Sequence, residues 1–284
     1  MLASCGMRQL FEIFEPAGPE SPIVVEIPHS GIDIPPQFLE PMIAPARALG
    51  RDADLYVDAL YEDAPAEGAT LLVAHTSRYV IDLNRSEADV DDDVVEGARA
   101  DIRMQHGLVW RSTSQGEPAL ARKLSREELG ERLEHVWRPY HETLAAIVQR
   151  KRAHFGVAVV VAAHSMPSVD RPMSPCCGVP RERADVVPGT CGMTTIHKRF
   201  LDPVESLARS QGWALRHDDP YAGGYTTKRY GLPAQEIHAI QIELARRLYL
   251  DEETLKPSDQ FAAARTWCRA LVAELAAVTR CGKP

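Results

Sequence analysis

Long apolar runs are missing from this 284-residue sequence. The longest, Val157–Ala163, has seven residues, whereas a helix that crosses a membrane needs about twenty. Basic charge is also scarce, because 32 Lys and Arg stand against 40 Asp and Glu, for a formal net charge of −8. A chain without a basic excess lacks the electrostatic footprint of a nucleic-acid-binding protein. We therefore expect a soluble protein that binds neither a membrane nor nucleic acid, and the sequence carries no signal for its oligomeric state.

Paired cysteines are missing as well. The six cysteines form no CxxC motif, and no secretory signal pattern precedes them. Scattered free thiols are typical of a reducing compartment, so we expect a cytoplasmic protein. Cys176, Cys177 and Cys191 lack the usual spacing of zinc ligands, which leaves a zinc site in this segment as a minor alternative.

Short apolar segments alternate with helical patterns along the chain. Runs rich in β-branched residues predict strands at 21–28, 70–74, 79–83, 157–163 and 237–244. Helical periodicity predicts helices from Asp52 onward and at 125–151, 200–210 and 253–279, with Ser125 as an N-cap and a kink at Pro139. Strands that alternate with helices indicate an α/β fold with a central mixed, mostly parallel sheet. We expect residues 1–284 to form a single domain.

Two histidines directly follow apolar strands, His29 in IPHSG and His164 in AAHSM. Sites of α/β proteins lie at the carboxyl ends of buried strands, so both imidazoles should meet there. Two histidines and one carboxylate, with a position left open, form a recurrent catalytic zinc set. Asp52 and Asp54 are the candidate carboxylates. Asp54 is preferred because Asp52 is the natural N-cap of the predicted helix, and both stay candidates.

An acidic residue closes the last predicted strand. The period of two places Glu243 on the same face as Ala239 and Gln241. Burial of a carboxylate is costly unless it is paired or functional. A metal-dependent hydrolase needs such a group to take a proton from water, which predicts Glu243 as the general base.

The segment SRYVIDLNR, residues 77–85, carries the predicted substrate-binding side chains. Arginine grips carboxylates bidentately, and Arg78 and Arg85 flank an apolar stretch, with Asn84 beside the second. We also expect Ser165 of the AHS segment to border the substrate. In the GGYTTKRYG segment, Gly224, Tyr225 and Arg229 are expected to close over the pocket, because paired glycines permit unusual backbone angles.

The chain resembles the N-formylglutamate amidohydrolases. The segments IPHSG, RDAD, SRYVIDLNR, AHS, GGYTTKRYG and HAIQIELARRLYLDE occur in the same order as in that family, from about Ile23 to Glu252. The resemblance implies a fold like that of the zinc carboxypeptidases and aspartoacylase, a mixed sheet sandwiched by helices. Zinc or another divalent ion is then the implied cofactor. In the carboxypeptidase pattern the acidic ligand comes three residues after the first histidine, where this sequence has Ile32.

The family pattern also implies a role for each candidate. The ligands fall on His29, His164 and Asp52 or Asp54, the carboxylate grip on Asn84 with Arg85, and the base on Glu243. The implied reaction is hydrolysis of N-formyl-L-glutamate to formate and glutamate, the last step of one route of histidine degradation. The alternatives are a deacylase or carboxypeptidase-like hydrolase of another N-acyl amino acid or short peptide, and a non-catalytic binder of an anionic amino acid.

Overall fold

A six-stranded sheet forms the centre of the computed structural model, which describes residues 9–98, 106–170 and 180–281. Its strand order is β1-β3-β2-β4-β8-β7. The four inner strands are parallel, whereas the two edge strands pair antiparallel with their neighbours. The predicted mixed, mostly parallel sheet is therefore confirmed. The strands are β1 (Phe11–Phe14), β2 (Ile23–Ile27), β3 (Thr70–Ala74), β4 (Ala158–Met166), β7 (Val186–Gly189) and β8 (Ile237–Ala245).

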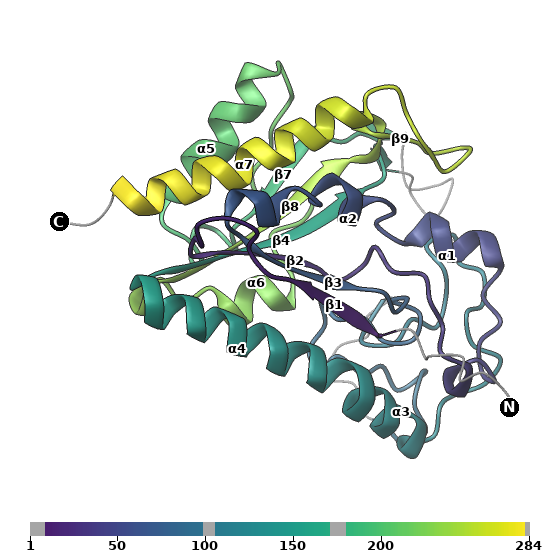
Figure 1. Cartoon of the computed structure of the whole chain (residues 1–284). Coiled ribbons are helices and arrows are strands. Elements are labelled where there is room, and N and C mark those ends of the chain that lie inside the picture. The colour runs from purple at the N-terminus through teal and green to yellow at the C-terminus, as the bar shows by residue number, and fades with distance from the viewer. Residues whose placement is uncertain (1–8, 99–105, 171–179, 282–284) are drawn as a thin grey trace, which may run out of the picture.

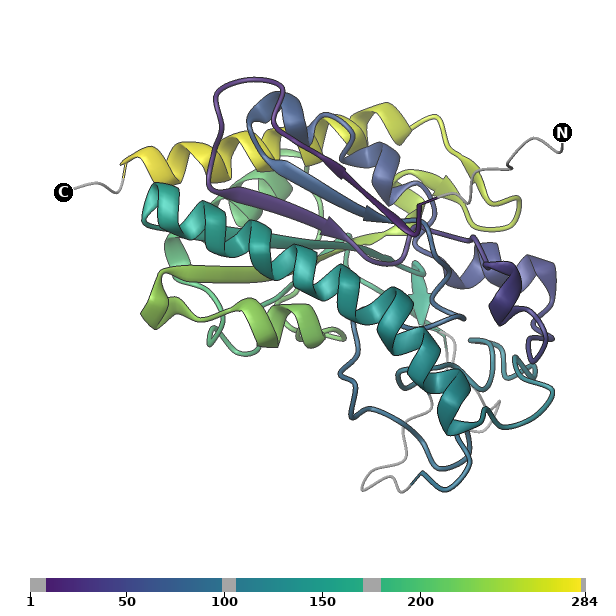
Figure 2. The ribbon, with the colours of Figure 1, turned by 60° about the horizontal axis from the view of Figure 1, so that its bottom comes forward.

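Helices cover both faces of this sheet (Figure 1). Figure 2 shows α4 lying along one face, while α7 lies on the other side of the strands. On β4, Val159 and Val161 pack into the core beneath α5 and α7, whereas Ala158 and Val160 pack toward α4 and α6. The helices are α1 (Ala46–Asp52), α2 (Val57–Leu60), α3 (Arg126–Arg132), α4 (Arg138–Phe155), α5 (Lys198–Ser210), α6 (Tyr225–Tyr230) and α7 (Phe261–Cys281).

The long helical segment that was predicted from Ser125 is present as α3 and α4 in succession. The Ser125 hydroxyl accepts a hydrogen bond from the backbone N–H of Glu128, and the Glu128 carboxylate accepts one from the backbone N–H of Ser125, so the capping box is complete. Between the two helices lies a π-helical turn, Leu133–Trp137. Because Pro139 has no N–H to donate, the regular hydrogen-bond ladder is broken here, which is the disturbance expected at the proline.

Two predicted elements are wrong. The 79–83 segment is not a strand but a turn, in which the N–H of Val80 donates to the carbonyl of Ser77 (2.9 Å). Its apolar side chains enter the core without a strand partner, which an apolar run cannot reveal. The helix expected to start at Asp52 instead ends there, because α1 starts directly after Pro45. The last helix begins at Phe261, later than the predicted start.

The edge strands β1 and β7 and the helix α6 were not predicted. Four two-residue strands complete the fold: β5 (Val169–Asp170) with β6 (Arg181–Glu182), and β9 (Leu250–Asp251) with β10 (Lys256–Pro257). Such short elements carry little periodic signal in a sequence.

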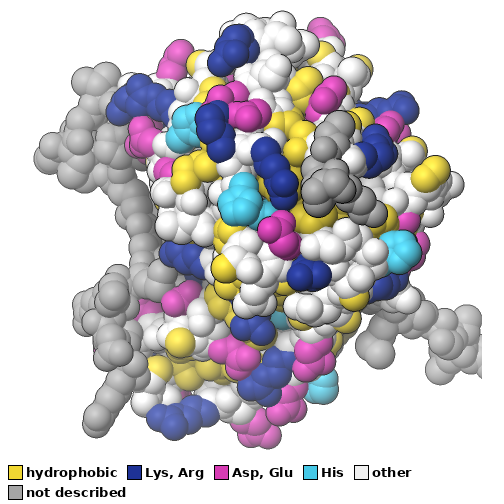
Figure 3. Space-filling view, turned by 90° about the vertical axis from the view of Figure 1, so that its left-hand side faces the viewer, with side chains coloured by type: hydrophobic (Ala, Val, Ile, Leu, Met, Phe, Trp, Pro, Cys, Tyr) yellow, Lys and Arg dark blue, Asp and Glu magenta, His cyan; other side chains and the backbone are white. Residues whose placement is uncertain are grey.

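Surface charge, helix composition and the thiols relate to three features considered in the sequence: nucleic-acid binding, membrane spans and a cysteine zinc site. In the view of Figure 3, Lys and Arg side chains alternate with Asp and Glu, without a broad basic area on that face. Among the described residues, no helix combines the length and apolar composition that crossing a membrane requires. Cys191 and Cys268 are free thiols. Cys176 and Cys177, the other members of the minor zinc alternative, lie outside the described residues.

Candidate active site

The carboxyl ends of β2 and β4 bring two histidines together. His29 follows β2 and His164 lies in β4, and their ring centroids are 4.9 Å apart. Asp54 reaches them from the loop between α1 and α2, where its backbone N–H donates to the carbonyl of His29 (2.9 Å). Oδ2 of Asp54 lies 3.0 Å from Nδ1 of His164 and 3.6 Å from Nδ1 of His29. We call these three buried residues the histidine–aspartate cluster.

The donor set of this cluster fits a divalent metal ion. Each of the three side chains offers one ligand atom, and these atoms lie within 4.8 Å of one another. Burial alone would raise the pKa of Asp54, but hydrogen bonds and charge from His164 and His29 outweigh it and hold that pKa well below its usual value. Asp54 is therefore an ionised carboxylate between two imidazoles, the combination typical of catalytic zinc sites.

The carboxylate of Asp82 orients His29 through Nε2, the ring nitrogen that does not face Asp54. Oδ1 of Asp82 lies 2.7 Å from Nε2 of His29, and its Oδ2 accepts hydrogen bonds from Arg78 Nη2 (2.8 Å) and Trp110 Nε1 (3.1 Å). With the ring hydrogen on Nε2, the lone pair on Nδ1 faces Asp54, as metal ligation requires. Sequence reasoning missed Asp82, although an acidic residue inside the apolar 79–83 run was a usable signal.

This arrangement changes the interpretation of Arg78. Its guanidinium is paired with Asp82 and lies over the ring of Trp110, 4.3 Å from the centroid. Arg78 therefore holds Asp82, which in turn contacts His29 of the cluster. Arg85, the other predicted arginine, is half-buried, and its Nε donates to the carbonyl of His106 (2.9 Å). The terminal nitrogens of Arg85 make no hydrogen bond within the described part of the chain.

Asn84 contacts His164 at Nε2, the ring nitrogen that does not face Asp54. Its Nδ2 is 3.2 Å from Nε2 of His164 and 3.2 Å from Oε1 of Gln241, and its Oδ1 accepts from the backbone N–H of Thr226 (3.0 Å). Gly224 approaches Asn84 so closely that a Cβ at that position would fall 2.2 Å from Nδ2, so any other residue would displace the Asn84 carboxamide.

Glu243 is held beside the cluster by strand register. His164 on β4 and Glu243 on β8 are paired residues of neighbouring parallel strands, which lie about 4.8 Å apart. Oε1 of Glu243 accepts a hydrogen bond from Gln241 Nε2 (2.8 Å). Burial raises the pKa of Glu243, and the charge of Asp54 adds to the rise while His164 opposes it. A buried carboxyl group with a raised pKa is a stronger proton acceptor than an exposed one once it is ionised.

Asp52 has a different place from Asp54. Its carboxylate accepts hydrogen bonds from the hydroxyl of Tyr79, the backbone N–H of Ser114 (3.0 Å) and Nε of Arg51 (3.2 Å). Asp52 thus ties the end of α1 to the 110–117 segment. Of the two predicted carboxylates, the structure brings Asp54 to the histidines and gives Asp52 a full set of other partners.

Ser165 and Arg246 hold Asp54 and its loop in place. The hydroxyl of Ser165 lies 3.4 Å from Oδ1 of Asp54 and accepts from Nε of Arg246 (3.3 Å). Arg246 also donates to the carbonyl oxygens of Arg51 (2.6 Å) and Ala53 (2.7 Å). The buried guanidinium therefore fixes the loop that presents Asp54. Sequence reasoning missed Arg246, because an arginine directly after β8 is typical of a surface position.

The remaining predicted residues lie on α6. Tyr225 is half-buried and packs against the rings of Trp137 (5.5 Å) and His141 (5.1 Å). Arg229 is exposed, and its guanidinium lies over the ring of Tyr225 at 5.8 Å and that of Tyr230 at 5.7 Å. Tyr225 therefore packs against α4 and the turn before it, whereas Arg229 lies on the exposed side of α6.

A further arginine lies on the β7 side of Glu243. Val187 on β7 is the register partner of Glu243 and belongs to a small apolar cluster covered by Tyr221. Nη1 of Arg183 donates to the hydroxyl of Tyr221 (3.2 Å), and its guanidinium lies over that ring at 5.4 Å. The sequence offered no reason to single out Arg183.

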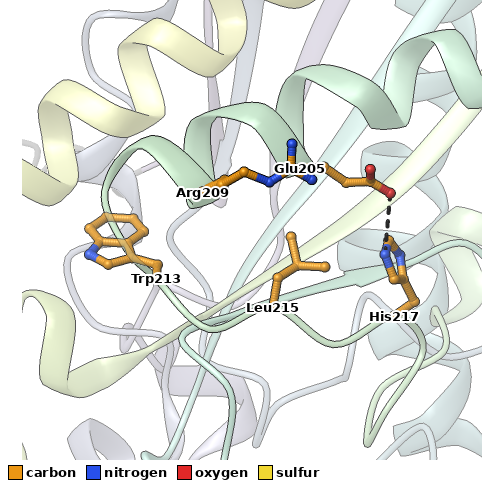
Figure 4. A pocket seen from close by; sticks show the side chains of 5 residues that line it. All are labelled: Glu205, Arg209, Trp213, Leu215 and His217. Carbon is orange, nitrogen blue, oxygen red and sulfur yellow. Dashed lines mark ion pairs between the residues drawn. The ribbon is translucent and has the colours of Figure 1, made fainter.

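A separate cavity of about 270 Å³ opens beside α5 (Figure 4). In its wall, Nε2 of His217 lies 3.3 Å from Oε1 of Glu205. None of its lining residues belongs to the histidine–aspartate cluster, and α5 covers the sheet face opposite α6. The lining residues are Glu205, Arg209, Trp213, Leu215 and His217.

Known proteins share both the sequence and the structure of this chain. The family model described as N-formylglutamate amidohydrolase matches residues 21–250. An N-formylglutamate deformylase from Pseudomonas putida is 34% identical over 239 residues, which is 81% of this chain and 82% of that protein. One from Pseudomonas aeruginosa is 32% identical and covers 82% of this chain and 83% of its own length.

Solved structures agree with the sequence relatives. The crystal structure of N-formylglutamate amidohydrolase from Ralstonia eutropha superposes with a TM-score of 0.86 at 32% identity, covering 96% of this chain and 99% of that chain. A gene product from Agrobacterium tumefaciens, at 18% identity and a TM-score of 0.69, covers 95% of this chain and 96% of its own and shares the fold. The family match, the curated relatives and the first of these structures lead to one conclusion: this chain belongs to the N-formylglutamate amidohydrolase family.

Proposed function

We propose that this enzyme hydrolyses N-formyl-L-glutamate to formate and glutamate with the help of a divalent metal ion, most simply zinc. The observation that carries the proposal is the buried His29–Asp54–His164 cluster, with Glu243 as the register partner of His164. A divalent ion held by the three ligands supplies positive charge that activates water and polarises the formyl carbonyl. The substrate is proposed from the relatives named N-formylglutamate deformylase.

Glu243 is the proposed general base. It lies one strand spacing from His164, within reach of a water molecule at the cluster. In the proposed reaction its carboxylate takes a proton from that water as the water attacks the formyl carbon. It then returns the proton to the amino nitrogen of glutamate as the amide bond breaks.

Asn84 and Arg85 are the proposed grip on a substrate carboxylate. If His164 held the ion through Nδ1, its ring hydrogen would lie on Nε2, and this nitrogen would no longer accept from Asn84. The Asn84 N–H that faces His164 would then be available to a substrate carboxylate, while the other stays on Gln241. Arg85, whose terminal nitrogens carry no described hydrogen bond, adds the positive charge.

The other predicted binding residues divide into two groups. Arg78 and Ser165 are engaged by Asp82 and Asp54, so we propose that they orient the cluster and do not touch the substrate. The α6 segment that contains Gly224, Tyr225 and Arg229 is proposed to border the substrate beside Asn84. We further propose that the reaction serves histidine degradation in the cytoplasm.

The test is a panel of N-acyl amino acids assayed with zinc-loaded, chelated and reloaded enzyme. We expect N-formylglutamate to be hydrolysed fastest, N-formylglutamine more slowly, and all turnover to disappear on chelation and return with zinc. Turnover that survives removal of all metal would exclude the metal-dependent mechanism. Preference for a longer acyl group or a dipeptide would move the function to a related deacylase or peptidase.

A variant pair tests the base. Glu243→Gln should lower kcat at least about 10²-fold with zinc content unchanged, because the amide cannot accept a proton. Glu236→Gln, at a half-exposed glutamate one residue before the same strand, is the matched control and should leave kcat unchanged. Near-normal turnover by Glu243→Gln would remove this residue from the mechanism.

A further inference from the structure

Gln241 is a buried amide whose three hydrogen bonds join separate parts of the site. It lies on β8, on the same face as Glu243, and only 4% of it is exposed. Its Nε2 donates to Oε1 of Glu243 (2.8 Å). Its Oε1 accepts from the backbone N–H of Gly224 (2.8 Å) and from Nδ2 of Asn84 (3.2 Å). Both ends of the carboxamide are therefore occupied.

The orientation of this amide is set by the backbone. The N–H of Gly224 can only donate, so the group that faces it must be the carbonyl oxygen of Gln241. The N–H of Thr226 fixes Asn84 in the same way, because it must face the oxygen of that carboxamide. The NH2 group of Gln241 is then left pointing at Glu243. Two backbone donors at the start of α6 thus determine which group is offered to the carboxylate.

The two oxygens of Glu243 are made unequal by this contact. Oε1 is held by Gln241, whereas no hydrogen bond from a described residue reaches Oε2. We propose that Gln241 is the positioning residue of the general base: it anchors Glu243 by Oε1 and leaves Oε2 as the oxygen that takes the proton. This inference rests on the proposed function of Glu243. It extends that function by assigning the reacting atom and the residue that selects it.

The first measurement is steady-state kinetics of Gln241→Leu. Without its anchor the carboxylate samples several orientations, so kcat should fall at least about tenfold with zinc content unchanged, while a change in KM reports the lost contact to Asn84. Ile240→Val, on the opposite face of the same strand, is the control for altered strand packing and should keep kcat within about twofold. An unchanged kcat in Gln241→Leu would overturn the assignment.

A double-mutant cycle separates positioning from a general structural effect. If Gln241 acts through Glu243, then Gln241→Leu should lower kcat less than about twofold further in the Glu243→Gln background. A full tenfold loss in that background would show that Gln241 acts by another route, and the proposal would fall.

A spectroscopic measurement tests the contact without any turnover. In ¹⁵N-labelled, zinc-loaded enzyme, the side-chain NH2 signal of Gln241 is assigned by its disappearance in Gln241→Leu. A hydrogen bond to a carboxylate should shift one of its two protons downfield, and Glu243→Ala should reverse that shift. An Nε2 signal that Glu243→Ala does not move would refute the contact. A wild type that leaves N-formylglutamate intact would refute the proposed function alone, since this signal does not depend on a substrate.

Discussion

Asp82→Asn is predicted to lower both the stability of the fold and its affinity for the metal ion. All four groups at this carboxylate are donors: the Nε2 hydrogen of His29, the guanidinium of Arg78, the indole N–H of Trp110 and the backbone N–H of Asn84. Asparagine has the same shape but replaces one oxygen with an NH2 group. In either orientation, this group must face donors on one side of the site.

The size of the loss in stability or metal affinity depends on which donors are left without an acceptor. Asparagine is neutral, so Arg78, whose side chain is only 15% exposed, loses its counter-ion in both orientations. If the remaining oxygen faces His29, Arg78 loses its hydrogen-bond acceptor as well. Removing one partner of a buried ion pair costs about 3–5 kcal/mol. If the oxygen faces Arg78 instead, His29 loses the acceptor that fixes its ring, and loss of such a partner typically lowers metal affinity about 10–100-fold.

Two assays measure the predicted losses of stability and zinc affinity, and one control variant accompanies them. Urea unfolding gives the free energy of unfolding, and competition with a chelator of known affinity gives the zinc dissociation constant. Asp93→Asn is the control, because Asp93 pairs with Arg111 at 3.1 Å on the surface and should contribute less than about 1 kcal/mol. Wild-type values of both stability and zinc affinity in Asp82→Asn would refute the reasoning.

Three further predictions concern other parts of the molecule. Asp54→Asn should abolish zinc binding, whereas Asp52→Asn should retain zinc and lose about 1–3 kcal/mol of stability, and zinc analysis with thermal melting would expose a reversal of these roles. Arg85→Lys should lower kcat/KM for N-formylglutamate at least about tenfold, because lysine lacks the bidentate fork. An equal loss with a substrate that has neither carboxylate would contradict that role. Burial lowers the pKa of His141 and of His238 from 6.5 to about 4. The unfolded chain therefore binds more protons between these pH values, and stability should fall by on the order of 1–2 kcal/mol per histidine from pH 7.5 to pH 5. Urea titrations of wild type and His238→Leu check this, and an equal pH effect in both would count against it.

Local patterns in the sequence were sufficient for the inner sheet. The 70–74 run coincides with β3, and the 237–244 run differs from β8 by one residue, because buried parallel strands are continuous apolar segments. His29 and His164 could be found for the same reason, since a polar residue directly after such a strand lies at the carboxyl edge. The capping box at Ser125 fixed the start of α3 equally well.

Features that depend on contacts between distant segments could not be predicted in this way. Asp52 and Asp54 are two residues apart, and their different partners follow from where α1 ends and from the 110–117 segment that meets Asp52. Asp82 contacts His29, and Gln241 contacts Gly224, and neither partner is a neighbour in the sequence. Side-chain pairing of this kind is a property of the folded chain and leaves no periodic trace.

The groups of the site differ in how firmly the fold holds them. His164 and Glu243 lie within a ladder of nine paired residues at the centre of the sheet, so their separation should persist until the whole chain unfolds. Asp54 and Asp82 are carried by segments without regular structure, which open at a lower free energy. We therefore expect hydrogen exchange to be slowest at Ala163 and Ile242 and faster at the loop amides. An ion bound here would escape by brief excursions of the loops while the sheet stays intact, so a chelator should inactivate the enzyme under conditions far milder than those that denature it.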